Sequence, residues 1–223
     1  MKKFSALKSL LGFRSFEPYY EPKTYEWVVN TFFKRSVVAE DVANLIARLI
    51  PRSKAVIVDM AAGTGLVSLP LMRLGYRVIA IDIDQQMLDE VKQKAESAAL
   101  EDVRIVRQNI NFFSNFPDNS VDGYTCMAAN RYIVNLDVFL SEIYRTLKPG
   151  GYFVWPIFAS DYVHWKLAAG FRQPVFSWTL AKLMKKKGYI NVKIDKFDSM
   201  IRNTMKGVPI YAIPTYIIAQ KKA

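Results

Sequence analysis

The chain has 223 residues, of which 51% are hydrophobic and 13% aromatic; this is enough to build a folded core and excludes wholesale disorder. Its one cysteine and one histidine exclude an intramolecular disulfide and a Cys/His metal site. A carboxylate metal site is not excluded by composition, but we expect no metal. The net charge is +11, and residues 160–223 carry +9 of it, so a basic face could contact nucleic acid or an anionic membrane, or could simply be solvated surface.

The first residues predict a short basic amphipathic helix. Phe4, Leu7 and Leu10 recur at helical spacing, and basic side chains lie mostly on the other side. Such a helix packs on its own domain, or it is a membrane-surface or lid helix, and these alternatives stay open. We expect this segment to be retained rather than cleaved as a signal peptide, because Lys8 interrupts its apolar region. No apolar run reaches the ~20 residues of a membrane span, so we expect a cytoplasmic protein that is at most peripheral at a membrane.

The remaining elements follow in chain order. Residues 16–33 are dense in aromatic side chains and predict, with the N-terminal helix, a helical and aromatic cap over residues 1–36. Apolar positions at helical spacing and short β-branched runs then alternate. We expect strands at 55–59, 77–82, 103–107, 121–127, 152–158, 189–194 and 211–220. We expect helices at 38–49, 66–74, 85–98, 136–147 and 176–187, and a Lys-Pro-Gly-Gly turn at 148–151 that closes the fourth of them.

This alternation predicts an α/β fold. Strands separated by helices form a parallel sheet with right-handed crossovers. We therefore expect a Rossmann-like, seven-stranded, mostly parallel sheet with helices on both faces and an antiparallel last strand. Residues 37–223 would form this domain, with an insertion at about 159–175.

A small-residue turn follows the first strand. Its glycines, Gly63 and Gly65, let backbone approach a ligand closely. A dinucleotide site would want a third small residue, here Ser68, and would place the acid Asp59 unfavourably near the pyrophosphate. A ligand with an amino group and a sulfonium would instead tolerate that acid. Asp82, which ends the second strand, can accept from both hydroxyls of a ribose.

These segments resemble the motifs of class I S-adenosylmethionine-dependent methyltransferases, in the ubiquinone/menaquinone-biosynthesis-like (methyltransferase type 11) subgroup. The resemblance covers residues 38–196 and includes a Glu-x-x-Arg-x-Leu-Lys-Pro-Gly-Gly motif at 142–151. It implies S-adenosyl-L-methionine as cofactor and an enzyme that transfers a methyl group by in-line displacement. The cofactor-binding residues that it implies are Asp59, Ala61, Gly63, Gly65, Asp82, Ile83, Met87, Asn109, Ile110 and Met127.

Two residues depart from the family pattern. Ala61 stands where glycine is usual, and its extra methyl could shift the methionine part of the cofactor. Asn109 replaces a common aspartate; its amide can still accept from the adenine amino group, and it can also donate. Both leave room for a weakened or altered cofactor site.

The acceptor side is less defined. Residues 128–132, after the fourth strand, should border the methyl group, and they lack the Asn-Pro-Pro-Tyr pattern of methylases that act on nucleobases or glutamine amides. A general base is needed only if the acceptor must lose a proton, so the scarcity of histidine does not count against activity. No catalytic residue is assigned; acceptor-side candidates, each of which could equally be structural, are Asn130, Arg131, Tyr132, Tyr20, Trp155 and His164.

Three functions stay open. The favoured one is methyl transfer to a small-molecule or lipid-like acceptor under the aromatic cap. The second is an RNA or protein methyltransferase that uses the basic C-terminal part. The third is a protein that binds S-adenosylmethionine without catalysis, which the departures at Ala61 and Asn109 would suit.

Overall fold

The computed structural model describes residues 21–112, 116–158, 177–196 and 214–223. Its strands are β1 (Val56–Met60), β2 (Arg77–Asp82), β3 (Val103–Arg107), β4 (Val121–Cys126), β5 (Leu147–Phe158), β6 (Tyr189–Lys196) and β7 (Pro214–Lys221). Its helices are α2 (Pro22–Phe33), α3 (Arg35–Leu49), α4 (Ser68–Arg73), α5 (Gln85–Ser97), the short 3-10 helix η1 (Asn130–Tyr132), α6 (Leu136–Thr146) and α8 (Ser177–Lys186).

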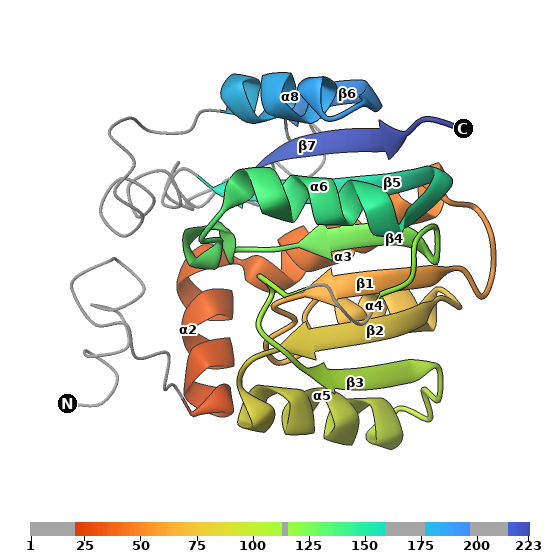
Figure 1. Cartoon of the computed structure of the whole chain (residues 1–223). Coiled ribbons are helices and arrows are strands. Elements are labelled where there is room, and N and C mark those ends of the chain that lie inside the picture. The colour runs from red at the N-terminus through yellow and green to blue at the C-terminus, as the bar shows by residue number, and fades with distance from the viewer. Residues whose placement is uncertain (1–20, 113–115, 159–176, 197–213) are drawn as a thin grey trace.

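The strands form one sheet in the order β3-β2-β1-β4-β5-β7-β6 (Figure 1). The pairs from β3 through β5 are parallel, whereas β7 enters between β5 and β6 and pairs antiparallel with both. The prediction of a seven-stranded, mostly parallel sheet with an antiparallel last strand is thus confirmed. The chain leaves β1 toward β3 on one side and returns to β4 on the other. The carboxyl ends of β1 and β4 therefore flank a topological switch point, where open α/β sheets bind ligands.

Helices cover both faces of this sheet. On one face, α6 and α8 bury side chains such as Phe139 and Met184 in a single apolar cluster with β4, β5 and β7. On the other face, α3 and α4 bury Val42 and Leu71, and α5 packs Val91 near β2. Helix α2 stands at the edge where the parallel strands end (Figure 1). The three layers leave the carboxyl ends of the strands and the loops that follow them as the place for a site.

The Lys-Pro-Gly-Gly segment differs from the prediction. The sequence predicts a turn there and a strand from residue 152, but β5 begins at Leu147, directly after α6. Leu147 pairs with Val121 and Tyr152 pairs with Gly123, so residues 148–151 bulge opposite a single residue of β4.

That single residue, Asp122, explains the bulge. Its side chain is 3% exposed, accepts from the Val56 N–H at 2.8 Å and from Lys148 Nζ at 2.9 Å, and pairs with Arg52. Gly151 passes so close that a Cβ there would lie 2.8 Å from the Asp122 carbonyl oxygen. The bulge therefore brings Lys148 to the buried carboxylate of Asp122. This contact lies at the amino edge of the sheet, opposite the switch point.

The other predicted elements agree with the structure to within a few residues. The strand expected at 121–127 ends at Cys126, and the helix expected at 176–187 is Ser177–Lys186. The basic N-terminal helix and the insertion at about 159–175 lie outside the described residues, and α2 is the described part of the expected cap. Within the described ranges, no helix is both long and apolar enough to span a bilayer.

Candidate functional site

The turn between β1 and α4 brings bare backbone to the carboxyl edge of the sheet. The Ala62 N–H donates to the Ile81 carbonyl of β2 at 2.8 Å, which ties the turn to the neighbouring strand. Gly63 and Gly65 have φ angles of 54° and 85°, in the left-handed region that glycine enters without a Cβ clash. A Cβ at Gly65 would lie 3.2 Å from Val91, so this glycine also lets α5 pack closely.

Asp82 ends β2, and two backbone groups orient its carboxylate. One oxygen accepts from the Gly63 N–H at 2.8 Å and the other from the Asp84 N–H at 3.0 Å. Burial raises the pKa of Asp82, and these backbone hydrogen bonds oppose that rise. Each carboxylate oxygen keeps a further lone pair, so two acceptors in fixed positions are available for a pair of adjacent hydroxyls. Asp84 then caps α5, as the sequence predicts, by accepting from the Gln86 N–H at 2.9 Å.

Asp59 is enclosed between β1 and the start of α4. It is 2% exposed, and its carboxylate accepts from Ser68 Oγ at 2.7 Å. Burial raises the pKa of Asp59 to about 7; the Ser68 hydrogen bond works against that rise, and the negative charge of Asp82 adds to it. The sequence predicts that this acid faces the crevice, whereas the structure buries it. Its influence on a ligand therefore comes from its charge and not from open contact.

Two alanines at this edge have left-handed backbone. The φ angle is 56° at Ala61, after β1, and 58° at Ala128, after β4. This conformation costs an L-residue about 1–2 kcal/mol, and such strain concentrates at functional sites. The sequence identifies Ala61 only as an extra methyl group, but the structure adds backbone strain at the same position.

We expect Ala61→Gly to raise the free energy of unfolding by about 0.5–1 kcal/mol, because relief of strain exceeds the added chain entropy of the unfolded state. Urea unfolding measures the change. Ala98→Gly is a matched control, because Ala98 follows α5 with a φ of −100° and gains no such relief. The control should be slightly destabilised, and equal changes in the two variants would contradict strain at residue 61.

The loop after β3 carries two residues expected to meet an adenine. Asn109 Oδ1 accepts from the backbone N–H and the side-chain amide of Asn111, at 2.9 and 2.8 Å. The Asn109 oxygen thus holds the loop. Its Nδ2 group can donate a hydrogen bond to the adenine, whereas an aspartate at this position could only accept one. Ile110 is buried, as is Met87 of α5, while Ile83 is 55% exposed. The last expected cofactor residue, Met127, is half-buried after β4.

Asn111 joins two loops of the site, and sequence reasoning missed it. Its Nδ2 donates to the Tyr132 carbonyl at 2.9 Å, and its Oδ1 accepts from the Val134 N–H at 2.9 Å. The loop after β3 is thereby fixed against the loop after β4. Phe112, Tyr132 and Val134 are exposed on this rim. The only sequence signal for this bridge is a pair of asparagines after a strand.

The structure separates the acceptor-side candidates. Asn130 and Trp155 are fully buried, and Trp155 Nε1–H donates to Asn130 Oδ1. Trp155 also stacks on Phe153, with ring centroids 5.2 Å apart, so it belongs to the core and not to a pocket lining. Asn130 fixes the loop after β4 from beneath, and Tyr132 stands exposed on the rim. Tyr20, His164 and the side chain of Arg131 lie outside the described residues.

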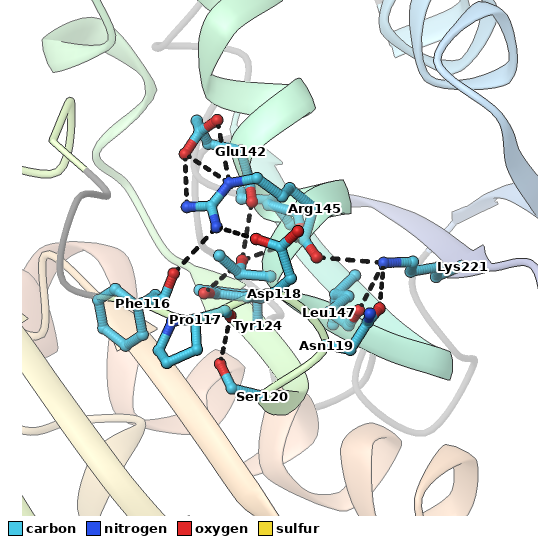
Figure 2. A network of polar contacts seen from close by, with 12 residues as sticks. Phe116, Pro117, Asp118, Asn119, Ser120, Tyr124, Glu142, Arg145, Leu147 and Lys221 are labelled. Carbon is cyan, nitrogen blue, oxygen red and sulfur yellow. Dashed lines mark hydrogen bonds and ion pairs between the residues drawn. The ribbon is translucent and has the colours of Figure 1, made fainter.

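The Glu-x-x-Arg motif lies at the end of α6, where β5 begins, and so at the amino edge of the sheet. Figure 2 shows its polar contacts. Arg145 donates to Glu142 at 2.8 Å and to the Phe116 carbonyl at 3.0 Å, and it pairs with Asp118. Lys221 of β7 donates to the Arg145 carbonyl at 3.1 Å. The motif therefore fastens the loop before β4 to α6 and β7, and its role is to hold the fold.

We expect Arg145→Met to lower the free energy of unfolding by about 1–3 kcal/mol, because one planar guanidinium serves three acceptors. Ligand affinity at the carboxyl edge should stay unchanged. Arg104→Met, at an exposed position of β3, is the control and should be nearly neutral. Urea unfolding and ligand titration of both variants test this, and a loss of affinity without a loss of stability would contradict it.

Metal ligands are sparse at the site. Among residues 21–112, 116–158, 177–196 and 214–223, no group of three or more His, Cys, Asp or Glu side chains could hold a metal ion. The groups present at the site are instead the fixed carboxylate of Asp82, the glycine turn and the buried acid Asp59.

Comparisons with known proteins agree with this arrangement. Residues 58–155 match a family model described as a methyltransferase domain. Over 103 residues the chain is 34% identical to a ubiquinone/menaquinone biosynthesis C-methyltransferase of Zymomonas mobilis, which covers 46% of this chain and 42% of that protein. Over 122 residues it is 31% identical to the mitochondrial 2-methoxy-6-polyprenyl-1,4-benzoquinol methylase of Schizosaccharomyces pombe, which covers 48% and 40%. The matches thus span about two fifths of these relatives' lengths.

A solved structure shares the fold. It is that of an S-adenosylmethionine-dependent methyltransferase from Aquifex aeolicus, and it aligns with a TM-score of 0.63 at 16% identity, covering 91% of this chain and 99% of that one. At this identity the likeness concerns the fold alone.

Proposed function

We propose that this chain is a class I S-adenosylmethionine-dependent methyltransferase, which binds S-adenosylmethionine and transfers its methyl group to a small-molecule acceptor. The match of residues 58–155 to a methyltransferase domain supports this proposal. The observation that carries the proposal is the carboxylate of Asp82, which the Gly63 and Asp84 N–H groups hold at the end of β2. That placement suits the two hydroxyls of a ribose, and it sits beside a turn whose glycines admit a ligand closely.

The residues present fit this cofactor. Asp82 would accept from the ribose hydroxyls, and Asn109, with Ile110 beside it, would meet the adenine. Gly63 and Gly65 would leave room for the amino-acid part, because neither has a side chain to fill that space. The negative charge of Asp59 favours a cationic ligand over a pyrophosphate. Ile83, Met87, Ala61 and Met127 would supply the apolar and backbone surface around it.

The chain contributes positioning and exclusion of water. When bound, the cofactor supplies an already activated methyl group, so the displacement needs an aligned acceptor more than it needs a strong base. Asn130, held by buried Trp155, and Asn111, which joins two loops, keep the rim of the site in place. Tyr132 is the described acceptor-side candidate that stands open to an acceptor.

The acceptor that we propose is a reduced quinone, that is, an electron-rich aromatic quinol. Two relatives are named for quinone biosynthesis and for a polyprenyl benzoquinol, and exposed Phe112, Tyr132 and Val134 give this rim an apolar surface. A ring carbon of the quinol would attack the methyl group, the sulfur–carbon bond would break, and the ring proton would leave to solvent. We place the protein in the cytoplasm, with this rim as the part that would meet a lipid-like acceptor.

We further propose that residues 37–223 form the catalytic domain and that residues 1–36, with α2 as their described part, form its cap. The insertion at about 159–175 would contribute to the acceptor side. The position of α2 at the carboxyl edge of the parallel strands supports the assignment of the cap (Figure 1).

Calorimetric titration and a transfer assay test the function. We expect saturable binding of S-adenosylmethionine and of its demethylated product, and labelled methyl transfer to reduced 1,4-naphthoquinone. Oxidised 1,4-naphthoquinone is the control and should accept no methyl group, because its ring carbons are electron-poor. Absence of binding to both cofactor forms would refute the proposal. Binding without transfer to any quinol would refute the acceptor and favour a binding protein without catalysis.

A further inference from the structure

Helix α2 lies beside the glycine turn. A Cβ built on Gly63 would lie 3.7 Å from Tyr25 Cε1 and 3.9 Å from its hydroxyl oxygen. The tyrosine ring therefore stands beside Gly63, at the distance where an added Cβ would touch it. The aromatic stretch at residues 16–33 predicts a cap in general terms, and the structure identifies Tyr25 as the side chain of that stretch that stands beside this turn.

A lysine of α5 holds the same turn from another side. Lys94 Nζ donates to the Thr64 carbonyl at 3.2 Å and forms an ion pair with Glu26 of α2. Glu90, one turn earlier on α5, is 3.9 Å away. The side chains of Lys94 and Glu26 are 28% and 32% exposed, so solvent and salt screen the pair less than they screen a pair on the open surface.

The hydrogen bond from Lys94 falls on the residue between the two glycines of the turn. Thr64 stands between Gly63 and Gly65, the two residues with the widest conformational freedom in the turn. A hydrogen bond on the Thr64 carbonyl fixes the plane of the peptide that joins it to Gly65. The Gly65 N–H of that peptide donates to the Ala62 carbonyl at 3.0 Å, so the orientation of one peptide passes to the rest of the turn.

We propose that Lys94 is a positioning residue of the cofactor turn and that, through Glu26 and the ring of Tyr25, it couples the docking of α2 to the binding of the cofactor. This rests on the proposed function. With Lys94 bonded to both Thr64 and Glu26, the ordered turn and the docked helix stabilise each other. Cofactor binding, which needs the ordered turn, must then also favour the docked helix, since such coupling is reciprocal.

Three variants of the full chain test the coupling, with S-adenosylhomocysteine as the probe. Lys94→Gln should weaken binding about tenfold in calorimetric titration, the scale of one charge-assisted hydrogen bond. Glu26→Gln removes the charge from the link to α2, which weakens that link, but keeps the Lys94 bond to Thr64; it should have a smaller effect in the same direction. Lys92→Gln is the matched control, because Lys92 lies on the same helix and pairs with Glu96, at 3.9 Å, on the open surface. The control should bind as the unmodified protein does.

Hydrogen exchange separates positioning from simple stability. S-adenosylhomocysteine should slow exchange of the α2 amides in the unmodified protein and in Lys92→Gln, and should do so much less in Lys94→Gln and Glu26→Gln. Lys94→Arg, which keeps the charge and a donor, should recover most of the affinity.

Two results would overturn the coupling while leaving the proposed function intact. One is unchanged affinity in Lys94→Gln, and the other is exchange of the α2 amides that does not change when the ligand binds. Absence of binding by the unmodified protein would instead overturn the proposed function and the coupling with it. If Lys94→Gln does not fold, Glu26→Gln decides the question by the same two readouts.

Discussion

Asp82→Ala is expected to weaken the binding of S-adenosylhomocysteine by about 1.5–3 kcal/mol, or roughly 10- to 150-fold. The carboxylate lies 2.8 Å from the Gly63 N–H and 3.0 Å from the Asp84 N–H, so it is held in place before any ligand arrives. Removal deletes the acceptors for two ribose hydroxyls and also leaves the Gly63 N–H of the turn without this partner. The loss of the ribose acceptors falls on the bound state alone. The loss of the Gly63 contact falls on the free and bound states alike, and it lowers affinity only as far as binding requires the ordered turn.

Calorimetric titration of Asp82→Ala measures this change, and two further variants interpret it. Asp82→Asn keeps one acceptor oxygen for the turn and should lose less affinity than the alanine variant. Asp84→Ala keeps its backbone N–H and loses only the helix cap, so it should lose about 1 kcal/mol of stability and little affinity. Equal affinity losses in Asp82→Ala and Asp84→Ala would mean that the effect arises from α5 and not from a ribose contact.

Asp59→Asn is expected to stabilise the protein at pH 8 and to weaken cofactor binding. Burial raises the folded-state pKa of Asp59 to about 7, above the value near 4 of an unfolded chain. Between about pH 4 and pH 7 the folded state therefore binds more protons than the unfolded state. The free energy of unfolding falls as pH rises through that window and levels off above it. The full difference corresponds to a penalty on the order of 4 kcal/mol at pH 8.

Asparagine keeps the acceptor for Ser68 but carries no charge to bury. The free energy of unfolding of the variant should therefore exceed that of the parent protein by about 2–4 kcal/mol at pH 8 and by much less at pH 5. Urea unfolding measures both values. Asp102→Asn is the control: Lys54 lowers the pKa of that exposed carboxyl, so its contribution is lost only in acid and should not vary between pH 5 and pH 8. A pH dependence that survives in Asp59→Asn would assign it to another group.

A buried acid that destabilises the folded protein is easier to understand at a ligand site than in a core. Its charge disfavours pyrophosphate and favours a cation, so the same residue that lowers stability would select the ligand. The left-handed backbone at Ala61 and Ala128 follows the same pattern, because both positions border the switch point of the sheet.

The strands and their mostly parallel arrangement could be predicted from the sequence, because buried parallel strands are short apolar runs that alternate with helices. Arg77–Asp82 matches its predicted bounds for this reason, whereas Val103–Arg107 matches its bounds as a short β-branched run with two exposed arginines. The position of the site could also be predicted, since the glycine turn follows the first strand and Asp82 ends the second.

Features made by contacts between distant residues could not be predicted. The bulge at residues 148–151 forms around the buried carboxylate of Asp122, and no local sequence pattern predicts this bulge. Trp155 looks like a pocket aromatic in the sequence but packs on Phe153, because β5 faces α6 at that position. The pairing of Lys94 with Glu26 joins residues 68 positions apart, and either alone reads as an ordinary surface charge.

A structure of the protein with S-adenosylhomocysteine tests the central claim most directly. We predict that both ribose hydroxyls lie within hydrogen-bond distance of the Asp82 carboxylate, with the adenine beside Asn109 and the amino-acid part over Gly63. A ligand bound elsewhere, or bound here with its ribose turned away from Asp82, would contradict the assignment of this crevice as the cofactor site.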